Sequence, residues 1–260
     1  MWNRQELKQQ AKQIMKRSYW KMFLVSLVAT ILMGILSRVD NHGGFHFTQS
    51  VQTYNDGFYN VNEVTHEGVS FVSGILGGIF PFNIAMHLSI ISIISIIVVI
   101  ASILYNIFIS NPIECGECHF YIENTDHEDT DFMTLFSAFK QGYMNIAKIL
   151  VIRDIKIFLW SLLFVIPGVI KSYQYRMLPY ILAENPDITT QDAFDRSKQL
   201  TDGQKLDIFV LDLSFIGWYF LGSILFGIGL YFVYPYFKST NALLYLYLSD
   251  QYRENSYYRY

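Results

Sequence analysis

The chain has 260 residues, of which 52% are apolar, 17% aromatic and only 16% charged, and its mean hydropathy is +0.25. Soluble globular chains carry about 25% charged residues, so this composition argues against a water-soluble domain. The formal net charge of −3 also excludes the broadly basic surface that nucleic-acid binding requires, so we predict no nucleic-acid partner.

Two long segments contain no Asp, Glu, Lys or Arg, one from Gly68 to Ile113 and one from Leu213 to Phe237. About 20 helical residues cross the hydrocarbon core of a bilayer, and both segments are longer than that. We therefore predict an all-α polytopic membrane protein with about six transmembrane helices. These would form three hairpins, each preceded by a cytoplasmic amphipathic helix, in a single integral membrane domain over residues 1–260.

The first amphipathic helix is expected over residues 2–17. One face of it is apolar, and basic residues recur every fourth position on another face: Arg4, Lys8, Lys12 and Lys16. A basic amphipathic helix beside a span lies on the anionic cytoplasmic leaflet, so we expect these four side chains to contact lipid headgroups. The alternative is a solvated helix that only obeys the positive-inside rule. Both interpretations place the N-terminus in the cytoplasm.

The first hairpin would consist of spans over residues 19–37 and 83–110, joined by a polar extracellular loop over residues 38–82. Three histidines occur in this loop without a recognised ligand spacing: His42, His46 and His66. We therefore interpret them as ordinary polar loop residues rather than as a metal site.

A cytoplasmic loop is predicted over residues 111–141. Its CGECH motif matches C-x-x-C-H, the attachment pattern of c-type haem, but haem is attached outside the cytoplasm. Zinc bound by Cys and His side chains is the second interpretation, and two reduced thiols are the one that we favour. We therefore predict no cofactor and no metal at the candidate ligands Cys115, Cys118, His119 and His127.

Two more hairpins follow, each after an amphipathic helix. One such helix is expected over residues 131–141, and Thr189 with Asp192 predicts a capping box that begins the other. The third and fourth spans would turn at Pro167 and Gly168. The fifth and sixth spans would cover about residues 206–228 and 231–248, with their turn at Gly229 and the C-terminus in the cytoplasm.

An internal repeat relates these hairpins at a shift of 61 residues. Landmark residues coincide at this shift: Gly142 with Gly203, Gly168 with Gly229, Tyr173 with Tyr234, and Tyr175 with Tyr236. Few other positions are identical, and hairpin proteins in general place Gly at turns and Tyr at interfaces. From the order of the landmarks we infer pseudo-repeats over about residues 1–122, 131–187 and 188–250, of which the first is the most diverged.

Several segments of the chain resemble a bacterial family of integral membrane proteins. They include SYWKMFLVSL near the N-terminus, NPIECG after the second span, and most of residues 160–250, with Glu184 to Ile188 as the most specific part. On these residues the chain resembles the family catalogued as domain of unknown function 975. The resemblance implies a multi-spanning protein of the bacterial cytoplasmic membrane and no particular activity. The chain departs from the family pattern at Cys115, Cys118 and His119, which weakens a metal or haem assignment.

Several charged residues fall inside the predicted spans, where charge is costly and commonly functional. When the two repeats are aligned on Gly142 and Gly203, Arg153 and Asp212 lie at nearly the same position along their spans. At 1.5 Å of rise per residue, they are within about 3 Å of the same depth in the membrane. We therefore predict an intramembrane ion pair between Arg153 and Asp212, with Asp154 facing Lys238 or Arg176. In the alternative, the spans begin later and these charges lie among the headgroups.

The sequence contains no H-E-x-x-H, G-x-S-x-G or P-loop motif, so we predict that the protein is not an enzyme. We expect a non-catalytic scaffold, regulator or protective factor that acts through anionic membrane lipids or a membrane protein partner, with its oligomeric state left open. The alternative is a transporter or channel for ions or small molecules, for which repeats, broken hairpins and buried charges are usual. A water-filled cavity at the charged residues would favour transport, whereas closed ion pairs would favour the first hypothesis.

Overall fold

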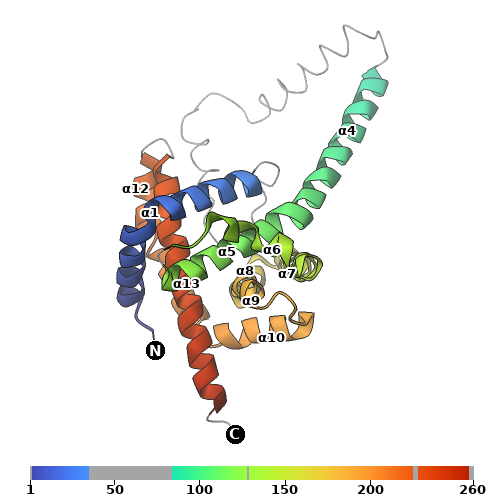
Figure 1. Ribbon diagram of the computed structural model, residues 1–260. Coiled ribbons are helices and arrows are strands. Elements are labelled where there is room, and N and C mark those ends of the chain that lie inside the picture. The colour runs from blue at the N-terminus through green and yellow to red at the C-terminus, as the bar shows by residue number, and fades with distance from the viewer. Residues whose placement is uncertain (1, 35–83, 128, 225–227, 258–260) are drawn as a thin grey trace. The chain divides into compact units, whose positions relative to one another are not determined.

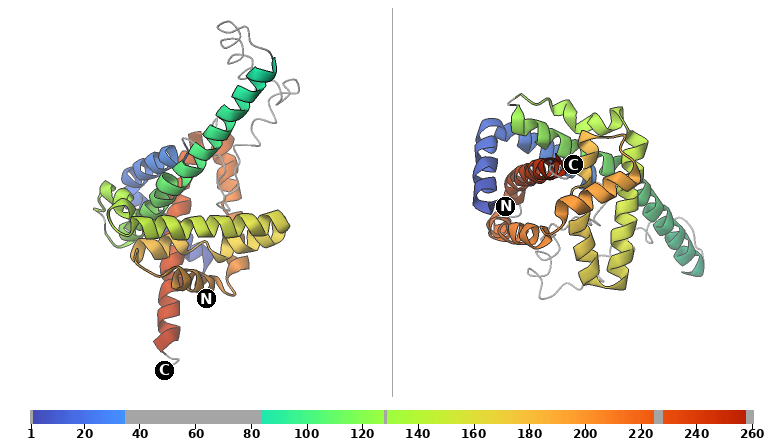
Figure 2. Two further views of the ribbon diagram at one scale, coloured as in Figure 1. Left: turned by 90° about the vertical axis from the view of Figure 1, so that its right-hand side faces the viewer. Right: turned by 90° about the horizontal axis from the view of Figure 1, so that it is seen from below.

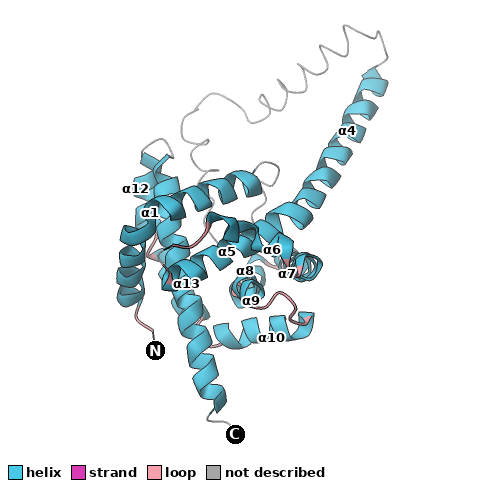
Figure 3. Ribbon diagram, viewed as in Figure 1, coloured by secondary structure: helices cyan, strands magenta, loops and turns pink. Residues whose placement is uncertain are grey.

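The structure is a computed structural model that describes residues 2–34, 84–127, 129–224 and 228–257 (Figure 1). These residues contain helices and no β-strand, which confirms the all-α prediction (Figure 3). In chain order the elements are α1 (Arg4–Gly34), α4 (Ile84–Tyr105), η1 (Asn106–Ser110), α5 (Asn111–Asp126), η2 (Phe132–Phe136), α6 (Ser137–Lys140), α7 (Tyr143–Leu163), α8 (Val165–Gln174), α9 (Leu178–Glu184), α10 (Thr190–Thr201), α11 (Lys205–Leu213), α12 (Ile216–Ile224) and α13 (Ile228–Tyr257).

The chain divides into two units, of which one is His46–Leu104 and the other comprises Met1–Phe45 and Tyr105–Tyr260. The first unit contains α4, an apolar helix without a charged residue. The predicted extracellular loop over residues 38–82 lies outside the described residues. Within those residues, two helices are long and apolar enough to cross a membrane, Ser92–Asp126 and Lys205–Ser223, so the six-span topology is not established by length and composition.

Helix α1 joins the predicted amphipathic helix to the predicted first span. Ser18 has φ −127° and ψ 27°, which is outside the helical region, and it marks a kink at the predicted junction. Just after the kink, the Lys21 ammonium donates a hydrogen bond of 2.7 Å to Asp129, and this bond lowers the pKa of that carboxyl. Arg17 donates to the Asn124 carbonyl at 2.9 Å, so the kink region is fastened to the C-terminal end of α5.

Helix α5 forms the centre of the buried core, so residues 111–126 of the predicted connecting segment are a buried helix rather than an irregular loop. Pro112 directly follows the π-helical segment η1, and the backbone continues through it in helical conformation. Helices α1, α7, α9 and α13 and the short helix η2 all contact α5. The approach of η2 is close: a Cβ at Gly116 would lie 1.8 Å from the Leu135 carbonyl oxygen. Only glycine fits there.

Helices α7 and α8 form an antiparallel hairpin, and both views of Figure 2 show them side by side. The turn lies at Phe164, whose φ of −156° and ψ of 144° are extended. The predicted turn at Pro167 and Gly168 is therefore wrong, since both residues lie inside α8. Pro167 is in the first turn of α8, where it removes no helical hydrogen bond. Gly168 instead permits close packing, because a Cβ there would lie 2.1 Å from the Ser161 hydroxyl oxygen.

In the C-terminal hairpin α12 packs against α13, whereas α11 contacts α8. Residues 225–227, between α12 and α13, lie outside the described residues, and Gly229 belongs to the first turn of α13 rather than to the predicted turn. A Cβ at Gly229 would lie 2.6 Å from the Gly222 carbonyl oxygen, so the two backbones are close. Helix α13 continues for 30 residues, about 45 Å at 1.5 Å per residue, with Pro235 in its interior.

The two hairpins share features at the predicted shift of 61 residues. Gly142 and Gly203 precede α7 and α11 with φ of 66° and 70°, a left-handed conformation that favours glycine. The close backbone contacts correspond as well: Ser161 with Gly222, and Gly168 with Gly229. The landmark glycines of the two hairpins therefore share local backbone conformation and close packing.

Helix α10 begins at the predicted capping box. The Thr189 hydroxyl accepts a hydrogen bond of 3.2 Å from the Asp192 N–H. One face of the helix is buried: Ala193, Phe194, Ser197, Leu200 and Thr201. The amphipathic helix predicted there is confirmed, and the one predicted over residues 131–141 is present as η2 followed by α6.

Candidate functional site

The candidate site is a set of buried ion pairs around α5. Glu114 and Glu117 are three residues apart, so in a helix they project from neighbouring positions of one face. Their carboxylates are almost fully buried, with side-chain exposures of 6% and 0%. A buried carboxylate is stable only when it is paired and hydrogen-bonded, and the surrounding helices supply both kinds of partner.

Glu114 pairs with Arg153 of α7 in a two-pronged arrangement. The Arg153 Nη1 and Nη2 atoms donate to the two Glu114 oxygens at 3.2 and 3.1 Å. The third donor position, Nε, binds the adjacent Asp154 at 2.9 Å, and the Asn111 amide donates to the other Asp154 oxygen at 3.1 Å. Paired donors that match both oxygens of a carboxylate fix geometry as well as charge, so this group holds α7 against α5.

Glu117 pairs with Lys238 of α13 at 2.9 Å. The Tyr234 hydroxyl also donates to Glu117, and the Ser26 hydroxyl of α1 donates to its other oxygen, each at 3.3 Å. Ser26 in turn lies 2.6 Å from the Tyr121 hydroxyl. One carboxylate of α5 therefore connects α1 and α13 inside the core.

Arg176, between α8 and α9, pairs with Asp212 of α11. Its Nη2 donates to Asp212 at 2.8 Å and to the Asn241 side-chain oxygen at 2.7 Å. The Tyr173 hydroxyl also donates to Asp212, at 2.8 Å. This pair therefore connects the α7–α8 hairpin to both α11 and α13.

The three ion pairs join three different pairs of segments. We name them the three-pair network: Glu114–Arg153, Glu117–Lys238 and Arg176–Asp212. The first links the α1–α5 segment to the α7–α8 hairpin, and the second links it to the C-terminal hairpin. The third links the two hairpins to each other. Each of the three segments is therefore joined to each of the other two by one buried ion pair.

The predicted pair of Arg153 with Asp212 does not form, because each of these residues binds a different partner. Asp154 faces neither Lys238 nor Arg176 in the described structure and binds Arg153 instead. The predicted pair was based on the positions of Arg153 and Asp212 along two predicted spans, and residues 111–126 were assigned to a connecting segment rather than to the core. With α5 in the core, Glu114 and Glu117 lie within ion-pair distance of Arg153 and Lys238.

Glu114 and Glu117, the two central carboxylates, were not among the site residues predicted from the sequence. A signal was present, because no carboxylate lies three or four positions from Arg153, which leaves room for an anion from another helix beside the adjacent Asp154. The NPIECGECHF segment was also consistent with a helix that begins at Pro112. Because this segment was predicted to be a loop, neither carboxylate was expected as a buried partner of a cation.

The Cys and His residues of α5 do not converge on a metal site. Cys115 and Cys118 are buried, and the Cys115 thiol donates to the Pro179 carbonyl at 3.5 Å. His119 turns toward the Ser137 hydroxyl at 2.9 Å and Glu123 at 3.4 Å. His127 lies just past the end of α5, nine residues after Cys118, and the helical residues between them alone rise about 12 Å, which is too far for a shared ion. Within the described residues, no group of three His, Cys, Asp or Glu side chains could hold a metal.

The basic residues of α1 lie near the start of the C-terminal hairpin. The Lys8 ammonium donates to the Ser214 carbonyl at 3.0 Å and lies 4.1 Å from the centre of the Phe215 ring. The Lys12 ammonium lies 5.6 Å from the Trp218 ring. Burial lowers the pKa of Lys8, and repulsion from Lys12 and Arg4 adds to the effect. The positive charges of Arg4 and Lys12 therefore repel that of Lys8.

Comparison with known proteins yields one match. A sequence profile of a protein family covers residues 1–252, and the family is described as "Protein of unknown function (DUF975)". No curated protein and no solved structure matches the chain.

Proposed function

This chain belongs to the DUF975 family of unknown function, and from that premise we propose that it is a non-catalytic, multi-spanning protein of the bacterial cytoplasmic membrane. It would act through anionic lipids or a membrane protein partner, as a scaffold, regulator or protective factor. In the proposed topology three hairpins cross the bilayer, with both termini in the cytoplasm.

The outer surface of the α7–α8 hairpin supports a membrane location. Residues 158–166 are all exposed, and Leu162, Val165 and Ile166 each expose 74% of their surface. Large exposed apolar patches mark membrane or protein contacts, since water would disfavour them. Helix α7 has 21 residues, about 31 Å at 1.5 Å per residue, which matches the thickness of the hydrocarbon core.

The proposal of a non-catalytic role rests on one observation: the buried charged side chains are paired with one another in the three-pair network. Charges that serve transport line a water-filled path, whereas these side chains bind one another and expose little surface. Arg153 and Lys238, for example, expose only 4% and 9%. Paired groups of this kind support a structural role within the bundle.

The topology can be tested by cysteine labelling. In a Cys115→Ala/Cys118→Ala background, Asp187→Cys reports on the segment before α10 and Val165→Cys reports on the tip of the α7–α8 hairpin. We expect a membrane-impermeant maleimide added to intact cells to label Val165→Cys only, and Asp187→Cys to be labelled after permeabilisation. The cysteine-free background is the control. Labelling of Asp187→Cys in intact cells would contradict the proposed topology.

The non-catalytic role can be tested against transport in proteoliposomes. We compare wild type with Glu117→Gln/Lys238→Met, which removes one ion pair with little change in volume, and measure proton and potassium flux with internal dyes. The proposal expects flux through both proteins to equal that of protein-free vesicles, because the charges are structural. Flux through wild type that the double substitution abolishes would favour the transporter alternative instead.

A further inference from the structure

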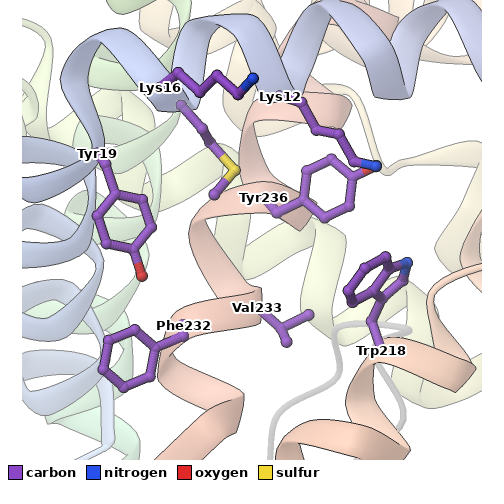
Figure 4. Close-up of a pocket in the computed structure, with 8 residues that line it drawn as sticks. Lys12, Lys16, Tyr19, Trp218, Phe232, Val233 and Tyr236 are labelled. Atoms are coloured by element: carbon purple, nitrogen blue, oxygen red, sulfur yellow. The ribbon is translucent and has the colours of Figure 1, made fainter.

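A groove lies between α1, α12 and α13 (Figure 4). Its volume of about 470 Å³ is within the range of small-molecule sites. The lining residues come from these three helices: Lys12, Met15, Lys16, Tyr19, Trp218, Phe232, Val233 and Tyr236. The three-pair network contributes none of them, so the groove is a separate feature.

The walls of the groove are aromatic and aliphatic. Figure 4 shows the rings of Tyr19, Phe232, Trp218 and Tyr236 arranged around the space, with Val233 between them. Trp218 and Phe232 remain 42% and 43% exposed, although both are large apolar side chains. An apolar occupant would remove these rings from contact with water, so the walls suit a hydrocarbon chain.

The rim of the groove is cationic. Lys12 and Lys16 lie one helical turn apart on α1, and their side chains extend along the same side of the groove (Figure 4). The Lys12 ammonium is 5.6 Å from the Trp218 ring and 5.8 Å from the Tyr236 ring. Among the residues that the structure describes, no carboxylate pairs with either lysine. An anion placed at this rim would therefore meet two uncompensated positive charges.

We propose that the groove binds one anionic phospholipid, with an acyl chain between the aromatic walls and the phosphate at Lys12 and Lys16. The inference rests on the proposed membrane location and specifies a lipid for it. A molecule with a hydrocarbon chain and a negative charge at one end matches both parts of the site. A soluble phosphate would make no use of the rings.

The form of α1 supports the same occupant. The kink at Ser18 separates the segment that bears the lysines from the apolar segment that follows it, and Tyr19 lines the groove directly after the kink. Tyrosine and tryptophan prefer the boundary between headgroups and hydrocarbon. A second copy of this chain would present the same row of cations, and repulsion would oppose its docking at this rim.

Native mass spectrometry of the purified full-length protein tests the proposal, with phosphatidylglycerol and phosphatidylcholine as probes. We expect wild type to retain phosphatidylglycerol preferentially, and Lys12→Gln/Lys16→Gln to weaken that binding about tenfold while leaving phosphatidylcholine unchanged. Trp218→Leu, at a partly exposed wall, should weaken both lipids. The matched control is Lys140→Gln/Lys148→Gln, which removes two exposed lysines of α6 and α7 and should change neither.

Three outcomes would overturn the proposal. The rim variant could bind phosphatidylglycerol as wild type does, or the control variant could lose binding to the same extent, which would indicate a non-specific charge effect. Glycerol phosphate could compete as well as the whole lipid, which would indicate a soluble anion site. Resistance of the protein to carbonate extraction from membranes is measured first. If the protein is extracted, the membrane proposal itself fails; if it is retained, these outcomes concern the groove alone.

Discussion

Arg153→Met is expected to lower the free energy of unfolding by about 3–5 kcal/mol, because it leaves a buried carboxylate without its cation. Glu114 exposes only 6% of its side chain, so water would not replace the lost cation. Methionine fills much of the volume of the arginine stem, so loss of packing contributes little. Thermal unfolding of the purified protein in detergent, followed by size-exclusion chromatography, measures the loss.

A second substitution that partly restores stability would distinguish loss of the ion pair from damage to the packing of α7. Glu114→Gln added to Arg153→Met should recover a large part of the stability, since the stranded charge is then removed. Lys148→Met is the control on the same helix, because Lys148 is exposed, and it should be neutral. If the double variant is no more stable than Arg153→Met alone, the pairing of Arg153 with Glu114 is wrong.

Lys238→Met is expected to be about as destabilising, again by about 3–5 kcal/mol, because Glu117 is the most deeply buried carboxylate of the network. Two hydroxyl donors would remain at Glu117, but neither carries a positive charge. The same thermal assay applies, and Glu117→Gln should again restore stability. Failure of Glu117→Gln to do so would contradict the assignment of this pair.

A surface pair of similar length provides a contrast with Lys238. Lys198 lies 2.8 Å from Asp195 on α10, and the hydrogen bond from Lys198 to Asp195 raises the pKa of Lys198. Both side chains are more than 40% exposed. Exposed pairs contribute at most about 1 kcal/mol, so Lys198→Met should have a small effect. Equal losses at Lys198 and Lys238 would mean that burial is not the cause.

Local features of the sequence predicted much of the fold. The capping box at Thr189 and the break between the predicted helix over residues 2–17 and the predicted span from residue 19 lie where short motifs placed them, and the landmark glycines Gly142 and Gly203 precede helices. Each depends on residues within about one helical turn, so the chain itself records it. The alternation of apolar and polar segments likewise predicted helices and no strands.

The ion pairs could not be predicted in the same way, because their partners are far apart in the sequence. Arg153 had several plausible anions, and the choice depended on whether α5 lies inside or outside the bundle. The polar NPIECGECHF segment was consistent with a loop, since Glu, Cys, Gly and His are common on surfaces. Its burial follows from five neighbouring elements that sequence patterns do not locate relative to it.

The turn of the α7–α8 hairpin shows a second limit. Proline and glycine together are typical of turns, but Pro167 is equally suited to the first turn of a helix. The chain reverses three residues earlier, at Phe164, which allows Gly168 to pack against Ser161. Here glycine serves close packing rather than chain reversal.

The triangular arrangement of the ion pairs has a consequence for biosynthesis. Until α13 has been synthesised, Glu117 has no cation, and until α11 has been synthesised, Arg176 has no anion. In the proposed membrane topology, a nascent or truncated chain would therefore carry unpaired charges at bilayer depth, which hinder stable insertion. The final hairpin thus completes the whole assembly, and prematurely terminated products should be selectively removed by membrane proteases.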